Sequence, residues 1–176
     1  TELADVADRG NVSGDPAGAA AAWSGADDAS FSFALAQDAQ GLYLVARVRD
    51  DVLVRSAAHA PNGDALVLTL AGPGASPTAP MHVEELLFYP GDPGNYAGVV
   101  RTRAGRVVAA AQLVEAPVRG GGGIVLEAMI PWSAMGPVGA GNRDALRGRL
   151  AYQDADDPAR PASMVSSAPR AAVTGR

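Results

Sequence analysis

Apolar and polar residues alternate along much of the chain, which is the pattern of a β-strand with one buried and one solvent-facing side. The clearest alternating runs are Phe31–Leu35, Leu42–Val48, Leu66–Leu70 and Ile124–Ile130. Further expected strands are His82–Tyr89, Tyr96–Arg103, Arg106–Glu115, Arg147–Asp154 and Ala171–Thr174. Clusters of glycine and proline separate these runs, and no clear amphipathic helix is present. The pattern predicts an all-β fold, an antiparallel sandwich or barrel.

The composition limits the core and excludes several classes of protein. The chain has 176 residues, enough for one core of ordinary size and short for two, so we expect a single domain over residues 1–176. Aromatic residues make up only 5%, so the core is expected to consist mainly of valine, leucine and alanine. Leu44, Leu68, Leu126 and Ile130 are the predicted centre of this core. Cysteine is absent, which excludes disulfides and thiolate zinc sites.

Charge and hydropathy also bear on the partners of the protein. A net charge of −5 argues against nucleic acid, because nucleic-acid-binding domains normally carry a basic surplus. No run of 18 apolar residues is present, so the sequence predicts no membrane span. All 14 basic residues are arginine.

Four segments in a fixed order resemble a known family. They are Gly41–Asp51, Gly63–Leu70, Leu126–Trp132 and Gln153–Asp157. In this order they are similar to the carbohydrate-binding module family 9-like β-sandwich domain, over residues 20 to 160 or so. The resemblance implies a jelly-roll-like sandwich, of the architecture that DOMON-like domains share. It also implies calcium stabilisation, sugar binding, no catalytic activity, and a place in a bacterial extracellular, cell-surface or periplasmic protein.

The aromatic residues depart from the family pattern. Sugar-binding members of the family hold the ligand between two exposed aromatic rings. Trp132 belongs to the Ile-Pro-Trp motif, where a buried structural ring is expected. Trp23 is the candidate stacking residue, and packing within the protein is its alternative role. Because a second exposed ring is not evident, a structural or protein–protein interaction module without sugar binding stays open as an alternative.

Aspartates stand at the ends of three expected strands. Asp50 and Asp51 close one strand, Asp64 opens the next, and Asp154 and Asp156 follow a late one. Strand ends converge at the rim of a sandwich, and calcium takes six to eight oxygen ligands, several of them carboxylates. These five residues are therefore candidate calcium ligands. The alternative is that they only cap turns and keep an alanine-rich domain soluble.

The arginines form three Arg-x-Arg pairs on separate expected strands. The pairs are Arg47 and Arg49, Arg101 and Arg103, and Arg147 and Arg149. Residues two apart lie on one face of a strand, so each pair points one way. If the three strands are neighbours, six guanidinium groups line one sheet face, suited to an acidic polysaccharide. The alternative is a solvated outer face.

Motifs for catalysis are weak. The sequence contains no Gly-x-Ser-x-Gly, His-Glu-x-x-His or phosphate-loop motif. Glu84, Glu85 and Glu127 are candidates for a glycosidase carboxylate pair, but we expect them instead to be ordinary charged residues on the surface of a strand. A b-type haem-binding redox subunit is a remote alternative, and its candidate axial ligands are Met81, His82, Met129, Met135 and Met164. The sequence therefore favours a non-catalytic module that binds a carbohydrate or acidic polysaccharide, with a protein partner as the alternative.

Overall fold

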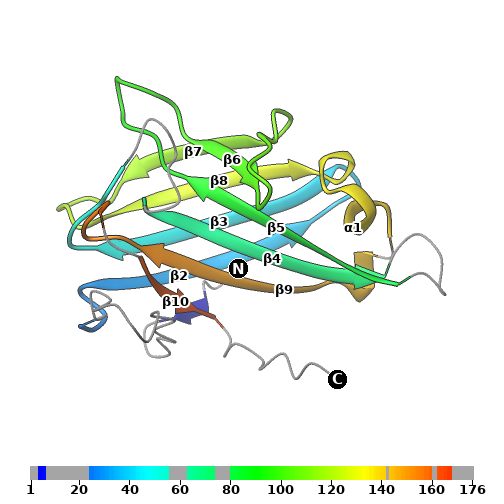
Figure 1. Ribbon diagram of the computed structural model, residues 1–176, viewed down its shortest axis with the longest axis horizontal. Helices are drawn as coiled ribbons and strands as arrows, with labels where there is room; N and C mark the ends of the chain where they lie inside the picture. The colour runs from blue at the N-terminus through cyan, green and yellow to red at the C-terminus, as the bar shows by residue number, and fades with distance from the viewer. Residues whose placement is uncertain are drawn as a thin grey trace.

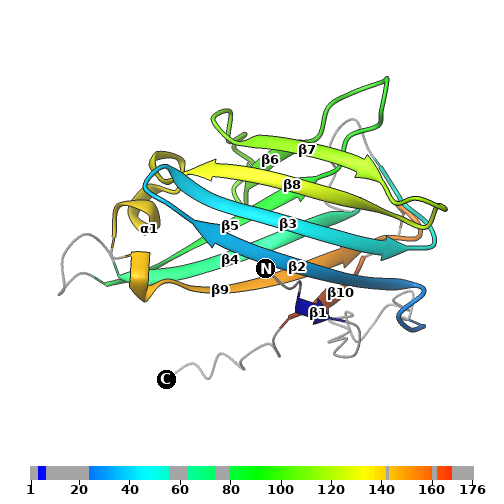
Figure 2. The ribbon, with the colours of Figure 1, turned by 180° about the vertical axis from the view of Figure 1, so that it is seen from behind.

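Two antiparallel sheets lie face to face and form a β-sandwich (Figures 1 and 2). The computed structural model describes residues 4–6, 24–55, 63–73, 80–141, 143–159 and 162–167. The first sheet has the order β1 (Ala4–Val6), β2 (Ala29–Gln37), β3 (Gly41–Asp50), β8 (Gly123–Pro131) and β7 (Gln112–Pro117). The second sheet has the order β10 (Ser163–Ser166), β9 (Arg147–Asp154), β4 (Ala65–Pro73), β5 (Met81–Tyr89) and β6 (Val99–Thr102). The predicted fold class is confirmed.

The core lies between the sheets and is built from the inward residues of the alternating strands. Leu44, Leu68, Leu126 and Ile130 are all buried in it, as the sequence predicts. The alternation is regular in β3, where every second residue from Leu42 to Val48 is buried and the residues between them are partly or fully exposed. Strand periodicity therefore decides which side chains face the core and which face solvent.

Short helical turns close one end of the sandwich. They are η1 (Trp132–Ala134), α1 (Gly136–Ala140) and η2 (Arg143–Ala145), and they connect β8 to β9 (Figure 1). Trp132 is only 4% exposed, and its Nε1 donates a hydrogen bond of 2.8 Å to the carbonyl oxygen of Asp38. The Arg143 guanidinium lies 4.8 Å from the centre of the Trp132 ring. The expected structural role of Trp132 is confirmed. Among the described residues, no helix is long and apolar enough to cross a membrane.

Several strands differ from the sequence expectation. The expected strand at Tyr96–Arg103 begins only at Val99, because the backbone of Asp92 and Tyr96 closes a tight turn before it. A second turn through Gly105, whose φ is +83°, delays the following strand until Gln112. The short edge strands β1 and β10 were not predicted, since three or four residues cannot show an alternating pattern. The expected strand at 171–174 lies outside the described residues.

Candidate functional site

Aspartates from three strands meet at the end of the sandwich opposite α1. β3 ends at Asp50, β4 begins just after Asp64, and β9 ends at Asp154. Antiparallel pairing brings these three positions to one end, and each side chain points between the sheets, on the same side as Tyr152. One carboxylate oxygen from each of the three aspartates lies within 4.8 Å of the other two. The predicted convergence of these residues is confirmed.

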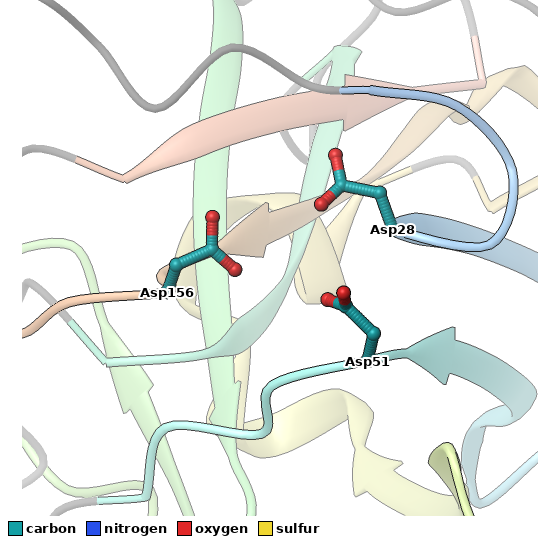
Figure 3. A group of neighbouring side chains, drawn as sticks. All are labelled: Asp28, Asp51 and Asp156. Carbon is teal, nitrogen blue, oxygen red and sulfur yellow. The ribbon is translucent and has the colours of Figure 1, made fainter.

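A second group of carboxylates lies beside the first. It consists of Asp28, Asp51 and Asp156, whose carboxylates point toward one another (Figure 3). Their oxygens also lie within 4.8 Å of one another. Asp51 follows Asp50 directly, so the two groups are neighbours in space. Asp28 was missed in the sequence, because only strand pairing brings it to the group: Ala29 is paired with Asp50, which places Asp28 opposite Asp51 at the open end of the β2–β3 hairpin.

Hydrogen bonds hold the inner carboxylates in place. Asp50 accepts hydrogen bonds from the backbone N–H of Val52, at 2.8 Å, and from the Tyr152 hydroxyl. Asp64 accepts from two backbone N–H groups, that of Val54 and, at 2.8 Å, that of Ala155.

Asp154 differs from the other two inner carboxylates. Its Oδ2 accepts from the Ser163 hydroxyl at 2.8 Å, but its Oδ1 is buried without a hydrogen-bond partner among the described residues. The Oδ1 of Asp156, in the outer group, is also buried without a hydrogen-bond partner among the described residues. These two carboxylate oxygens are therefore buried from water and accept no hydrogen bond from any described residue. Burial of this kind destabilises the folded protein unless a ligand binds there.

Burial and mutual repulsion change the acidity of the inner group. Burial first, and then the charge of Asp50, raise the pKa of Asp64 to about 8, against the opposing effect of its backbone hydrogen bonds. Burial, followed by the charges of Asp50 and Asp156, raises the pKa of Asp154 to about 7, although the hydrogen bond from Ser163 opposes this. Burial also raises the pKa of Asp50. The described ion pairs do not include any of these carboxylates. An arrangement of this kind can hold a metal ion, whose charge would stabilise the deprotonated carboxylates.

A polar cleft lies on the outer face of the second sheet, with a volume of about 340 Å³. Its lining residues come from β5, β9 and the β6 hairpin: Leu87, Tyr89, Arg101, Thr102, Arg103, Gly105 and Gln153. Gln153 is paired with Ala65 of β4, and Ala65 belongs to the same buried apolar cluster as Leu87 and Tyr89. The cleft therefore combines an apolar floor with polar groups at its sides.

Arg101 has incomplete hydrogen bonding within this cleft. Its Nη1 donates to the carbonyl oxygen of Gly105 at 3.0 Å. Its Nε is buried and has no acceptor within the described part of the chain. Beside it, the Nε of Arg103 lies 3.6 Å from Glu85 Oε2. The cleft is thus lined by two guanidinium groups, those of Arg101 and Arg103.

The six paired arginines do not share one face, so that prediction is wrong. Arg47 and Arg49 lie on the outer face of the first sheet, because β3 pairs with β2 and β8. The other two pairs share the outer face of the second sheet, Arg147 and Arg149 on β9 and Arg101 and Arg103 at β6. β4 and β5 lie between these strands, a span of three strand spacings, or about 14 Å. The two arginines of each pair do lie on one face of the chain, as predicted, but the sequence did not show which sheet each pair belongs to.

The other sequence candidates lie at separate places. Trp23 is outside the described residues. Glu84 and Glu85 are neighbours on β5, so their side chains point to opposite faces of the second sheet, whereas Glu127 lies on the outer face of the first sheet.

The candidate haem ligands are also dispersed. Met135 is fully buried in the core, whereas Met81 is exposed on β5. His82 follows Met81 on the same strand and points to the opposite face of the second sheet. Met129 belongs to β8 of the first sheet and Met164 to β10 of the second.

A shallow apolar hollow lies on the outer face of the first sheet. Tyr43, Val45, Val114 and Met129 line it, together with Gln112 and Glu127, and its volume is about 200 Å³. Val114 is 66% exposed. This is a second surface with the features of a contact site.

The comparisons with known proteins show the fold. No protein-family model and no curated protein sequence matches the chain. Among solved structures, the chain is similar to a carbohydrate binding module family 9 (CBM9) from Caldicellulosiruptor kristjanssonii in complex with cellotriose. The two are 15% identical with a TM-score of 0.56, over 93% of this chain and 72% of that chain. A CBM9 from the same organism in complex with glucose gives 15% identity and a TM-score of 0.57, over 94% of this chain and 73% of that chain. The β-sandwich that the sequence resemblance implied is therefore the fold observed.

Proposed function

We propose that this domain is a non-catalytic carbohydrate-binding module of an exported or cell-surface protein. The proposal depends mainly on the cleft over β5, β6 and β9. Its volume of about 340 Å³ falls within the range of about 300–1,000 Å³ of small-molecule sites, near the lower end, where a single sugar ring fits. Guanidinium, amide and hydroxyl groups surround an apolar floor, as recognition of sugar hydroxyls requires. Two solved structures of the same fold, both of a CBM9 from Caldicellulosiruptor kristjanssonii, contain glucose and cellotriose, which supports the same class of ligand.

The carboxylates at the end of the sandwich are proposed to hold calcium. The described donors are all oxygen, the ligand type that calcium prefers over the nitrogen and sulfur of zinc sites. The Oδ1 atoms of Asp154 and Asp156 fit this role, because they are buried and have no hydrogen-bond partner among the described residues. A bound cation would also offset the repulsion that raises the pKa values of the group.

The calcium site and the cleft share a strand. Gln153 lines the cleft and Asp154 belongs to the inner carboxylates, so consecutive residues of β9 serve the two places. The Gln153 amide also donates a hydrogen bond of 2.6 Å to the carbonyl oxygen of Gly63, next to Asp64. Calcium would thus fix the backbone on which one side of the cleft is built, without itself contacting the sugar.

Carbohydrate binding is tested by two measurements. A glycan array that contains neutral and acidic saccharides shows whether the protein binds sugar at all. Titration of ¹⁵N-labelled protein with the best ligand then locates the contact, and we expect backbone amide shifts concentrated at residues 101–105 and around Gln153. Shifts concentrated at the hollow beside Tyr43 would place the sugar site on the other sheet. Silence on every glycan would refute the proposed function.

A protein-interaction module is the second candidate. The exposed apolar hollow of Tyr43, Val45, Val114 and Met129 is the observation that favours it. If the array is silent, Val114→Arg provides the test, since a charge at this exposed position should abolish partner binding without affecting folding.

A further inference from the structure

Arg101 lines the cleft with a guanidinium group whose donors are only partly used among the described residues. In a guanidinium group, Nε and Nη2 donate in parallel from one edge, and Nη1 donates from another. The hydrogen bond from Nη1 to Gly105 fixes the orientation of the group, while the buried Nε has no acceptor among the described residues. A guanidinium group held in a fixed orientation is suited to a carboxylate, to which it donates charge-assisted hydrogen bonds.

The charges near Arg101 also favour an anion. On the strands of the second sheet, the outer face carries Arg101, Arg147, Arg149 and a single glutamate, Glu85, and Arg103 follows directly after β6. Glu85 lies 3.6 Å from Arg103 and accepts a hydrogen bond of 3.3 Å from Thr69, so it is already engaged by other groups. No described carboxylate forms an ion pair with Arg101.

The pKa of Tyr89 also indicates that positive charge is concentrated in the cleft. Burial raises the pKa of the Tyr89 hydroxyl, whereas the charges of Arg101 and Arg103 oppose this rise. Both guanidinium groups therefore lie close enough to the phenol to act on it. An anionic ligand beside Tyr89 would meet two positive charges and only one negative charge.

We propose that the cleft binds a sugar that bears a carboxylate, a uronic acid, with the carboxylate on the guanidinium group of Arg101. This inference rests on the proposed carbohydrate-binding function and narrows its ligand. A neutral sugar hydroxyl leaves the positive charge without a counterion. A carboxylate accepts hydrogen bonds from the guanidinium group and also neutralises its charge. The apolar floor at Leu87 and the side wall of Tyr89 accommodate the sugar ring.

Glucuronate and glucose form a matched pair of ligands, because they differ only in the carboxylate at C6. Isothermal titration calorimetry with the calcium-loaded protein should show that methyl glucuronide binds roughly tenfold or more tightly than methyl glucoside. The preference should weaken as salt is raised. Arg101→Gln should remove the preference, and Arg101→Lys should retain the salt dependence but lose most of the affinity. Arg47→Gln, on the outer face of the other sheet, is the control and should bind as the unmodified protein does.

The outcomes separate the two proposals. Equal affinity for the two glycosides, or a preference that survives in Arg101→Gln, overturns the inference and leaves carbohydrate binding standing. Binding of neither glycoside, together with silence on the glycan array, overturns both. Far-UV circular dichroism and the urea unfolding midpoint of each variant show whether the cleft has kept its structure. If Arg101→Gln fails to fold, the affinity ratio of the unmodified protein for the two glycosides decides the inference.

Discussion

Asp154→Asn separates a calcium-binding role of the end carboxylates from a role in capping turns. Asparagine has nearly the same shape as aspartate and no charge. Its amide oxygen can take the place of Oδ2 and still accept the hydrogen bond from Ser163. Its amide nitrogen then takes the place of Oδ1, which has no hydrogen-bond partner among the described residues. The substitution thus removes the charge and keeps the observed hydrogen bond.

The effect expected without metal follows from the acidity of Asp154. The residue is 3% exposed, and its pKa is raised from 3.8 to about 7. A raised pKa means that the deprotonated form of Asp154 destabilises the native state relative to the unfolded state, by 1.36 kcal/mol for each pKa unit. In chelator at about pH 8, Asp154→Asn should therefore increase the free energy of unfolding, by up to about 4 kcal/mol.

With calcium the stabilising effect of the same substitution should become much smaller. A cation at one hundred times its dissociation constant stabilises the native state by about 2.7 kcal/mol. Asp154→Asn removes one charged ligand, so the variant should lose most of this gain. Calcium should then raise the unfolding midpoint of the unmodified protein much more than that of the variant.

Urea unfolding at constant pH, followed by the fluorescence of the buried Trp132, measures both effects. The control is Asp27→Asn, which removes a carboxylate whose side chain is 96% exposed and which pairs with Arg49 at 3.0 Å. This variant should respond to calcium as the unmodified protein does. If Asp154→Asn instead destabilises the protein equally with chelator and with calcium, the carboxylates only cap turns and the calcium proposal is wrong.

Two further predictions concern pH and the link between the two sites. In metal-free protein the native state binds protons more tightly than the unfolded state, because the pKa of Asp64 rises from 3.8 to about 8. The free energy of unfolding should therefore fall as the pH rises through this window, by about 1.4 kcal/mol per unit for this group, and a urea midpoint that rises instead would contradict the assignment. Chelation at neutral pH should weaken sugar binding in calorimetry, because Gln153 and Asp154 are consecutive on β9; unchanged affinity would show that the two sites are independent.

The local pattern of the sequence determined much of the fold. Period-two alternation fixed which residues of β3 and β8 are buried, because successive side chains of a strand point to opposite faces. The limits of the alternating runs also showed that aspartates stand at strand ends, and strand ends in a sandwich meet at its rims. The convergence of Asp50, Asp64 and Asp154 was predictable for this reason.

Only the tertiary structure decided which strands are neighbours. Strand order depends on hydrogen bonds between residues far apart in the chain, and alternation within one strand carries no record of them. For this reason the arginine pair of β3 is separated from the pairs of β6 and β9, although the three look alike in sequence. The pairing of β2 with β3 brought Asp28 to the carboxylates, and the burial of Arg101 Nε and Asp154 Oδ1 likewise arises only when several strands close over them. The sequence thus determined the faces of the strands, and the non-local contacts of the sandwich decided which of those faces form sites.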